Sequence, residues 1–258
     1  MDVATGPTNI KFCGITNLED AQLAHELGAW AIGLILWPGS PRRCMPAAGA
    51  EIAARLKRRL EVVGVFVNPT LEQVVALSDE IGLTTIQLHG DEGPSFCAEV
   101  ARRTGCKVIK AMRVRSRADI QALVPFRTDY HLLDSHVPGR RGGSGETFEW
   151  ELARAHRGQV PVILSGGLNP DNVAEAIGVV RPFAVDVASG VEASPGRKDP
   201  RKLEAFAKEV AGAHVRRPSR TTRAPREKAS PDGERAASPR EHVPARRRAH
   251  APAGTTFR

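Results

Sequence analysis

The chain has 258 residues and a mass of 27.8 kDa, with 41% hydrophobic and 26% charged residues, a composition typical of an ordinary globular protein. Its net charge of +8 comes from the C-terminal end, because residues 212–258 hold 12 of the 37 Lys and Arg but only 4 of the 29 Asp and Glu. The preceding 211 residues are neutral overall, which excludes net charge as evidence for a nucleic-acid-binding domain there.

Targeting, membrane and metal signals are weak. Residues 1–11 lack the basic segment and apolar core of a secretory signal. The longest uncharged stretch, 27–41, is too short to span a bilayer and contains Gly and Pro. The cysteines are widely spaced without a C-x-x-C pair, which argues against a zinc site or a disulfide scaffold; they are Cys13, Cys44, Cys97 and Cys106. We therefore expect a cytoplasmic protein without a metal.

Short apolar or β-branched runs alternate with stretches of helical periodicity along the first 213 residues. The runs that predict strands are 9–14, 31–36, 62–67, 85–88, 107–112, 130–133, 160–164 and 184–187. Three intervening helices have clear ends and are predicted over 18–28, 70–82 and 171–181. Asn17 is the expected N-cap of the first, Thr70 and Gln73 have the spacing of a capping box, and Pro170 is expected near the first turn of the third.

Eight strand–helix units within about 200 residues predict one α/β domain, a (β/α)8 TIM barrel. The alternative is a doubly wound open sheet, which often has a glycine-rich first turn. Residues 14–17 here read GITN, not G-x-G-x-x-G. The sequence therefore favours the barrel.

The composition changes near residue 211, where Pro, Arg, Ser, Ala and Thr begin to dominate. Val243 is the only large apolar residue between Val215 and Phe257, and such a segment cannot bury enough surface to offset its chain entropy. We predict a barrel over 1–213 and a disordered basic tail over 214–258. The arginines at 246–248 could contact nucleic-acid phosphates, but without interleaved aromatic residues a solvated extension is favoured.

The active site of a barrel lies at the C-terminal ends of its strands. Gly166 and Gly167 follow the seventh predicted strand, and Ser189 and Gly190 follow the eighth. Barrels commonly bind phosphate at these two loops, where unobstructed backbone N–H groups face the ligand. These residues therefore predict a phosphorylated substrate, with simple tight turns as the alternative.

Cys13 and Asp134 end the first and sixth predicted strands. A lone cysteine is more often a small buried hydrophobe, and a carboxylate after an apolar run can simply cap a loop. At a barrel mouth the two side chains would instead form an acid/base pair on either side of one substrate.

Other loops at this end of the barrel offer further contacts. Arg42 could clamp an anion, with a plain surface arginine as the alternative. His89 is interpreted as a ligand contact, with a satisfied polar residue at a strand end as the alternative. The long glycine-rich loop 136–147 is expected to be a lid or a substrate contact, with a plain surface loop as the alternative, and it is not a P-loop. The other three cysteines are interpreted as structural or incidental.

With these residues in place, the chain resembles phosphoribosylanthranilate isomerase, a barrel enzyme of tryptophan biosynthesis, over roughly residues 9–211. The matching stretches are 11–16 (KFCGIT), 63–68 (VGVFVN), 87–90 (QLHG), 132–134 (LLD), 142–145 (GGSG) with 147–150 (TFEW), 164–170 (LSGGLNP) and 185–192 (VDVASGVE). Phe12 replaces the family's usual Ile, and Ala188 replaces the first Ser of a Ser-Ser-Gly turn.

The resemblance implies an Amadori rearrangement of N-(5-phosphoribosyl)anthranilate to the corresponding 1-(2-carboxyphenylamino)-1-deoxyribulose 5-phosphate, without a cofactor. It assigns Asp134 as the general acid that opens the ribose ring and Cys13 as the base that removes the C2′ proton. The remaining implied contacts are the anthranilate side for Arg42 and His89, the sugar for Asp186, and the phosphate for Gly166, Gly167, Ser189 and Gly190.

Two related barrel families fit less well. The histidine-pathway isomerase has Asp rather than Cys at the end of its first strand and an internal repeat that this chain lacks. Indole-glycerol-phosphate synthase has a lysine-centred signature that is missing here. The sequence leaves the oligomeric state open.

Overall fold

The computed structural model describes residues 6–134, 148–156 and 158–213. All of them belong to the first of two compact units, Met1–Pro218. The predicted disordered tail at 214–258 and the predicted lid at 136–147 lie outside the described residues.

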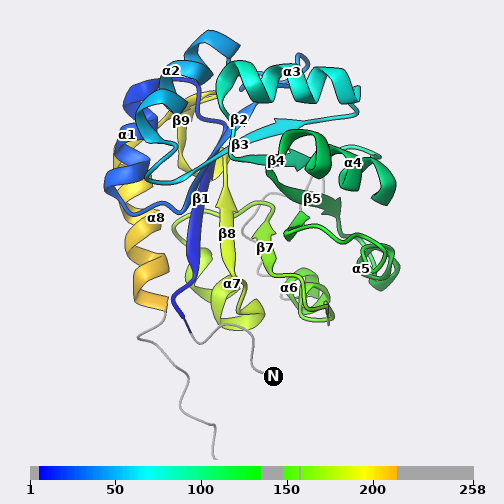
Figure 1. Cartoon of the computed structure of the whole chain (residues 1–258). Coiled ribbons are helices and arrows are strands. Elements are labelled where there is room, and N and C mark those ends of the chain that lie inside the picture. Colours follow the sequence, from blue (N-terminus) through cyan, green and yellow to red (C-terminus); the bar gives the residue numbers. More distant parts are fainter. Residues whose placement is uncertain (1–5, 135–147, 157, 214–258) are drawn as a thin grey trace, which may run out of the picture. The chain divides into compact units, whose positions relative to one another are not determined.

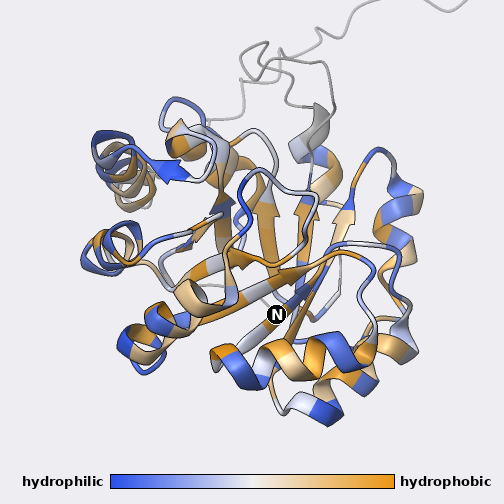
Figure 2. Ribbon diagram, turned by 90° about the horizontal axis from the view of Figure 1, so that it is seen from above, coloured by the Kyte–Doolittle hydropathy of each residue, from blue (hydrophilic) through white to orange (hydrophobic). Residues whose placement is uncertain are grey.

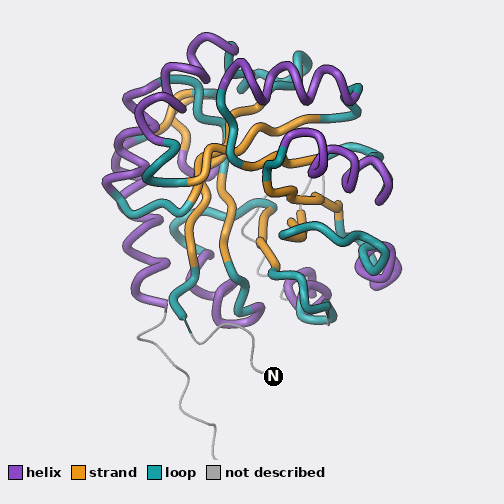
Figure 3. Tube along the Cα trace, in the orientation of Figure 1, coloured by secondary structure: helices purple, strands orange, loops and turns teal. Residues whose placement is uncertain are grey.

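Eight parallel strands form a closed barrel in chain order, with β8 paired to β1 (Figures 1 and 3). The strands are β1 (Asn9–Cys13), β2 (Ala31–Ile35), β3 (Glu61–Phe66), β4 (Thr85–Leu88), β5 (Lys107–Arg113), β6 (Tyr130–Asp134), β7 (Val162–Ser165) and β8 (Ala184–Val187). The predicted (β/α)8 barrel is confirmed, and each predicted run coincides with a strand.

Helices follow the strands on the outside of the barrel (Figure 3). Within the described residues they are α1 (Leu18–Glu26), α2 (Pro46–Leu56), α3 (Leu71–Ile81), α4 (Pro94–Thr104), α5 (Arg117–Ala122), α6 (Phe148–Ala153), α7 (Val173–Val180) and α8 (Pro200–Ala213). Between β8 and α8 the chain adds a 3₁₀ turn, η1 (Ser189–Val191), and a small antiparallel pair, β9 (Glu192–Ser194) and β10 (Arg197–Lys198).

Local capping signals in the sequence are confirmed for two helices. Thr70 accepts a hydrogen bond from the Gln73 backbone N–H, and the Gln73 side chain accepts one from the Thr70 N–H. Asn17 caps α1 by accepting from the Asp20 N–H. These caps satisfy N–H groups that have no partner within the helix.

The predicted start of the seventh helix is wrong by two residues. The helix begins at Val173 with Asn172 as its N-cap, so Pro170 lies before its first turn. Asn169 accepts from the Asp171 N–H, and Asn172 accepts from the Asn169 N–H. These side-chain bonds give the backbone an alternative to the helix at residues where proline was expected to start it.

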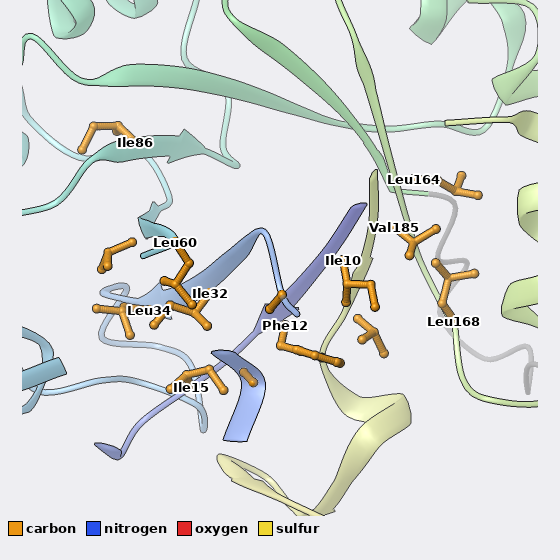
Figure 4. Close-up of a cluster of buried hydrophobic side chains, with 14 of the residues drawn as sticks. Ile10, Phe12, Ile15, Ile32, Leu34, Leu60, Ile86, Leu164, Leu168 and Val185 are labelled. Atoms are coloured by element: carbon orange, nitrogen blue, oxygen red, sulfur yellow. The ribbon is translucent and has the colours of Figure 1, made fainter. Parts of the chain in front are cut away.

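Alternation along the strands separates two buried regions. Even-numbered β1 residues such as Ile10 and Phe12 belong to the buried cluster between strands and helices (Figure 4). Phe12 there meets Phe206 of α8 edge to face. Odd-numbered residues such as Cys13 face the barrel interior, together with Ala31, Val63, Val65, Ile109, Ala111, Leu132, Ile163 and Ala184. The strands are mainly hydrophobic and the surrounding helices amphipathic (Figure 2), as expected for strands buried on both faces.

No helix in the described part of the chain is long and apolar enough to cross a membrane.

Candidate active site

Polar side chains gather where the strands end at the C-terminal side of the barrel. Cys13 ends β1, Asp134 ends β6, Ser165 ends β7, and Asp186 lies one residue before the end of β8. Each occupies an inward position in the alternation of its strand, because Cys13 and the inward residues Leu132, Ile163 and Ala184 share the interior cluster. Polar side chains therefore line the mouth of the barrel.

Cys13 lies beside a buried ion pair. The Lys11 ammonium is 2.7 Å from Asp186 Oδ1, and the Ser165 hydroxyl donates to Asp186 Oδ2 at 3.0 Å. Burial raises the pKa of the Cys13 thiol, while the charge of Lys11 lowers it, and the pKa remains above its ordinary value. Cys13 is therefore a thiol that becomes a strong base once it loses its proton.

Asp134 faces His89 across the mouth. His89 Nε2 lies 3.4 Å from Asp134 Oδ2, and its Nδ1 lies 3.1 Å from the Gln87 amide nitrogen. With that amide as donor, Nδ1 accepts and the ring proton sits on Nε2, facing the carboxylate. Gln87 lies on β4 and His89 directly follows that strand, so the Gln87 amide orients the His89 imidazole toward the predicted acid.

Arg42 lies in the loop between β2 and α2, and its guanidinium is held by Glu192 of β9. Arg42 Nε lies 2.9 and 3.0 Å from the two Glu192 carboxylate oxygens, and Nη2 lies 2.8 Å from Oε2. Burial alone would raise the pKa of Glu192, but hydrogen bonds and charges from Arg42 and Lys198 lower it. The predicted anion clamp thus already carries one carboxylate, and Nη1 makes no hydrogen bond to any described residue.

The loops after β7 and β8 pack closely against each other. Gly166 and Gly167 have φ angles of 101° and 63°, in the left-handed region that favours glycine. A Cβ on Gly190 would lie 2.0 Å from the Leu168 carbonyl oxygen, whereas one on Gly167 would meet nothing within 4 Å. The four predicted phosphate residues therefore lie on two touching loops. Close approach of the backbones explains why residue 190 is a glycine, whereas at Gly167 a side chain would have room.

Two buried lysines of the site were not anticipated from the sequence. Lys11 could have been noticed, because it stands at an inward position of an apolar strand, two residues before Cys13. Lys198 carried no such signal. Its ammonium donates to the Cys13 carbonyl at 2.6 Å and to the Ala188 carbonyl at 3.0 Å, which ties the ends of β1 and β8 together where their pairing stops.

The remaining cysteines lie away from this ring of polar groups. Burial raises the pKa of Cys44 and of Cys97 to about 11, and both belong to the layer between barrel and helices. Among the described residues, no group of His, Cys, Asp and Glu is arranged to hold a metal ion.

Comparison with known proteins gives a consistent result. Residues 10–209 match the family model described as N-(5′-phosphoribosyl)anthranilate (PRA) isomerase. An isomerase of that name from Citrifermentans bemidjiense is 48% identical over 79% of this chain and 98% of its own length. Another from Geobacter sp. is 47% identical over 79% of this chain and 98% of its own length.

Solved structures agree with the sequence comparison. The phosphoribosyl anthranilate isomerase of Thermotoga maritima superposes with a TM-score of 0.73 at 43% identity, over 80% of this chain and 99% of that one. A second isomerase structure, in complex with reduced 1-(o-carboxyphenylamino)-1-deoxyribulose 5-phosphate, has a TM-score of 0.69 at 40% identity, over 80% and 99% of the two chains. With the barrel and the polar side chains at its mouth, these matches show that the chain belongs to the N-(5′-phosphoribosyl)anthranilate isomerase family.

Proposed function

We propose that this protein converts N-(5-phosphoribosyl)anthranilate into 1-(2-carboxyphenylamino)-1-deoxy-D-ribulose 5-phosphate in tryptophan biosynthesis, by general acid/base catalysis with Asp134 and Cys13. The observation that carries the proposal is the family match over residues 10–209 on a barrel whose β1 and β6 end in these two side chains. The steps are proton transfers, so the proposed chemistry calls for no metal and no redox cofactor.

Asp134 is the proposed acid. Its carboxyl gives a proton to the ribose ring oxygen while the C1′–O bond breaks, and the anilino nitrogen lone pair forms the C1′=N bond of a Schiff base. The carboxylate that remains faces His89 Nε2 at 3.4 Å. A donor in that position favours the charged form of the acid as the ring opens.

Cys13 is the proposed base. Its thiolate removes the C2′ proton, and the electron pair of the C2′–H bond moves toward nitrogen to give an enolamine. The enolamine is protonated at C1′ and loses the C2′ hydroxyl proton, which produces the ketone. Lys11 and Lys198 place positive charge near the sulfur, and both favour the thiolate.

The substrate is held at both ends in this proposal. The loops of Gly166, Gly167, Ser189 and Gly190 bind the phosphate, and Asp186 lies beside the sugar. Arg42 and His89 face the anthranilate. Binding at a remote phosphate holds the flexible opened sugar in the geometry that both proton transfers need.

The test is turnover, followed by the loss of phosphoribosylanthranilate fluorescence. Cys13→Ser should lower kcat to less than about a tenth of the wild-type value, because a hydroxyl is far too weak a base near neutral pH. Cys97→Ser is the matched control, since it makes the same change at a buried thiol outside the mouth. A folded Cys13→Ser enzyme with more than that tenth would remove the thiolate from the mechanism.

We also propose that the barrel, residues 1–213, carries the activity without the basic tail at 214–258, and that the enzyme acts in the cytoplasm, a reducing compartment that suits its four free thiols. Within the described residues, the last helix, α8, ends at Ala213. Deleting residues 214–258 should change kcat/KM by less than about twofold, the scale of a change outside the folded core. A larger loss of kcat/KM would show that the tail contributes to activity. Salt-dependent nucleic-acid binding by the full-length protein that the truncated protein lacks, in a filter or polarisation assay, would show that the tail has a function of its own.

A further inference from the structure

Lys11 is a charged side chain with no exposure to solvent inside the barrel. It stands directly opposite Asp186 in the pairing of β1 with β8, and its ammonium is 2.7 Å from the Asp186 carboxylate. Burying such a pair in place of apolar side chains is often neutral or unfavourable for stability. Its presence at the reactive end of the barrel therefore calls for an explanation beyond folding.

The same ammonium lies near the Cys13 sulfur. Gly33 of β2 leaves a small space beside both groups, because a Cβ there would lie 2.7 Å from Cys13 Sγ and 3.1 Å from Lys11 Nζ. The two atoms are therefore at most about 5.8 Å apart, close enough for the charge of Lys11 to lower the pKa of the Cys13 thiol. Lys11 therefore contacts the carboxylate of β8 and lies close to the thiol of its own strand.

The charges around the thiol come from three directions. Lys11 lies on β1 itself, Asp186 on the neighbouring β8, and Lys198 on β10, while β2 contributes the uncharged Gly33. Burial alone would lower the pKa of Lys11, but Asp186 and the thiolate raise it. Lys11 thus keeps its positive charge. That charge acts on the sulfur inside the protein, away from water, where electrostatic interactions are stronger than in solvent.

We propose that Lys11 is a positioning residue for the isomerisation: it holds a positive charge against the Cys13 sulfur and sets the fraction of Cys13 that is thiolate, with Asp186 and Ser165 holding Lys11 in place. The inference rests on the proposed function in that Cys13 is the base. It assigns Asp186 an action through Lys11 in addition to its proposed place beside the sugar. It also gives a reason for Gly33, since a larger residue would displace the pair.

The experiment is a pH titration of Cys13 by the ultraviolet absorbance of its thiolate in the full-length protein. Each background is measured with Cys13 and with Cys13→Ser, and the difference isolates this one thiol from the other cysteines and from tyrosine. The backgrounds are wild type, Lys11→Met, Lys11→Arg, Asp186→Asn and Lys110→Met. Lys110→Met is the matched control, because Lys110 is also buried, lies 2.8 Å from the Glu92 carboxylate and sits on β5.

Opposite shifts are the expected result. Lys11→Met should raise the titration midpoint and lower the thiolate fraction near neutral pH at least about tenfold, because an opposite charge at this range moves a pKa by about one to three units. Asp186→Asn should lower the midpoint, because the amide oxygen can still accept from Lys11 while the negative charge that opposes the thiolate is lost. Lys11→Arg, which keeps the charge, should stay near the wild-type value, and Lys110→Met should leave the midpoint unchanged. If the Lys11–Asp186 pair had a purely structural role, Lys11→Met and Asp186→Asn would shift the titration midpoint of Cys13 in the same direction, since each variant leaves one buried charge unpaired.

An unchanged midpoint in Lys11→Met, or shifts of the same sign in the two variants, would overturn the proposal. If Lys11→Met does not fold, Asp186→Asn and the double variant Lys11→Met/Asp186→Asn decide, because the double variant leaves no charge unpaired and should titrate above Asp186→Asn alone. Turnover is not needed for this readout. An active Cys13→Ser enzyme together with the expected shifts would refute Cys13 as the base but support the effect of Lys11 on its titration. An inactive Cys13→Ser enzyme with no shifts would support Cys13 as the base and refute the effect of Lys11.

Discussion

The two ends of the barrel are built from different chemistry. At the N-terminal end, Trp30, Tyr130 and Phe183 meet with ring centroids 5.1 Å apart in all three pairs. At the C-terminal end, a lysine and an aspartate are buried beside a thiol. Aromatic rings bring large apolar area and favourable edge contacts, so the first end is suited to stability and the second to chemistry.

Ion pairs occur at both ends, but their exposure differs. Lys107 pairs with Glu61 at the N-terminal end with 46% of its side chain exposed, whereas Lys11 pairs with Asp186 at 0%. An exposed pair contributes little and is screened by salt. A buried charge affects its neighbours strongly, and this chain buries the Lys11 pair where a neighbouring thiol has a proton to lose.

The largest effect on activity is expected from Asp134→Asn at the C-terminal end. An amide cannot supply the proton that opens the ring, so kcat/KM should fall by about 10²–10⁴, the usual contribution of a general acid. Steady-state kinetics on the purified variant would measure it, with thermal unfolding as the check on folding. Near-normal turnover would place the acid elsewhere.

A smaller effect is expected at the phosphate loops. Gly190→Ala would force η1 away from the Leu168 carbonyl, because its Cβ has no room there. We expect at least about a tenfold loss in kcat/KM, the scale of one lost hydrogen bond to a charged group, and weaker binding of inorganic phosphate in calorimetry. Gly178→Ala on α7 is the control, since a Cβ there meets nothing within 4 Å. Unaltered phosphate affinity in a folded Gly190→Ala would move the phosphate site away from these loops.

The smallest effect on activity is expected from Trp30→Ala at the aromatic end. Removing one ring of the cluster should lower the free energy of unfolding by about 2–3 kcal/mol, somewhat less than for a fully buried aromatic side chain. The kcat/KM of the folded variant should stay within about twofold, since the site lies at the other end of the strands. Denaturant unfolding and kinetics on one preparation measure both, and a large loss of activity without a loss of stability would contradict the division between the ends.

Much of the fold was predictable because its signals are local. Each strand is rich in apolar or β-branched residues, and the caps at Asn17 and Thr70 depend on residues only three positions apart. Cys13 and Asp134 were predictable as candidates for a related reason, since a barrel brings all strand ends to one rim. The start of α7 was not, because the side chains of Asn169 and Asn172 compete with the helix for backbone groups.

The sequence by itself determined the barrel, its eight strands and the set of polar residues at their ends, because period, apolar runs and caps act over a few neighbouring residues. Only the tertiary structure decided how those residues are paired. Lys198 reaches the Cys13 carbonyl across 185 positions of sequence, and Lys11 meets Asp186 across 175. Such pairings follow from closing β8 onto β1, a long-range event that brings charge to the thiol and leaves no trace in the local pattern of either segment.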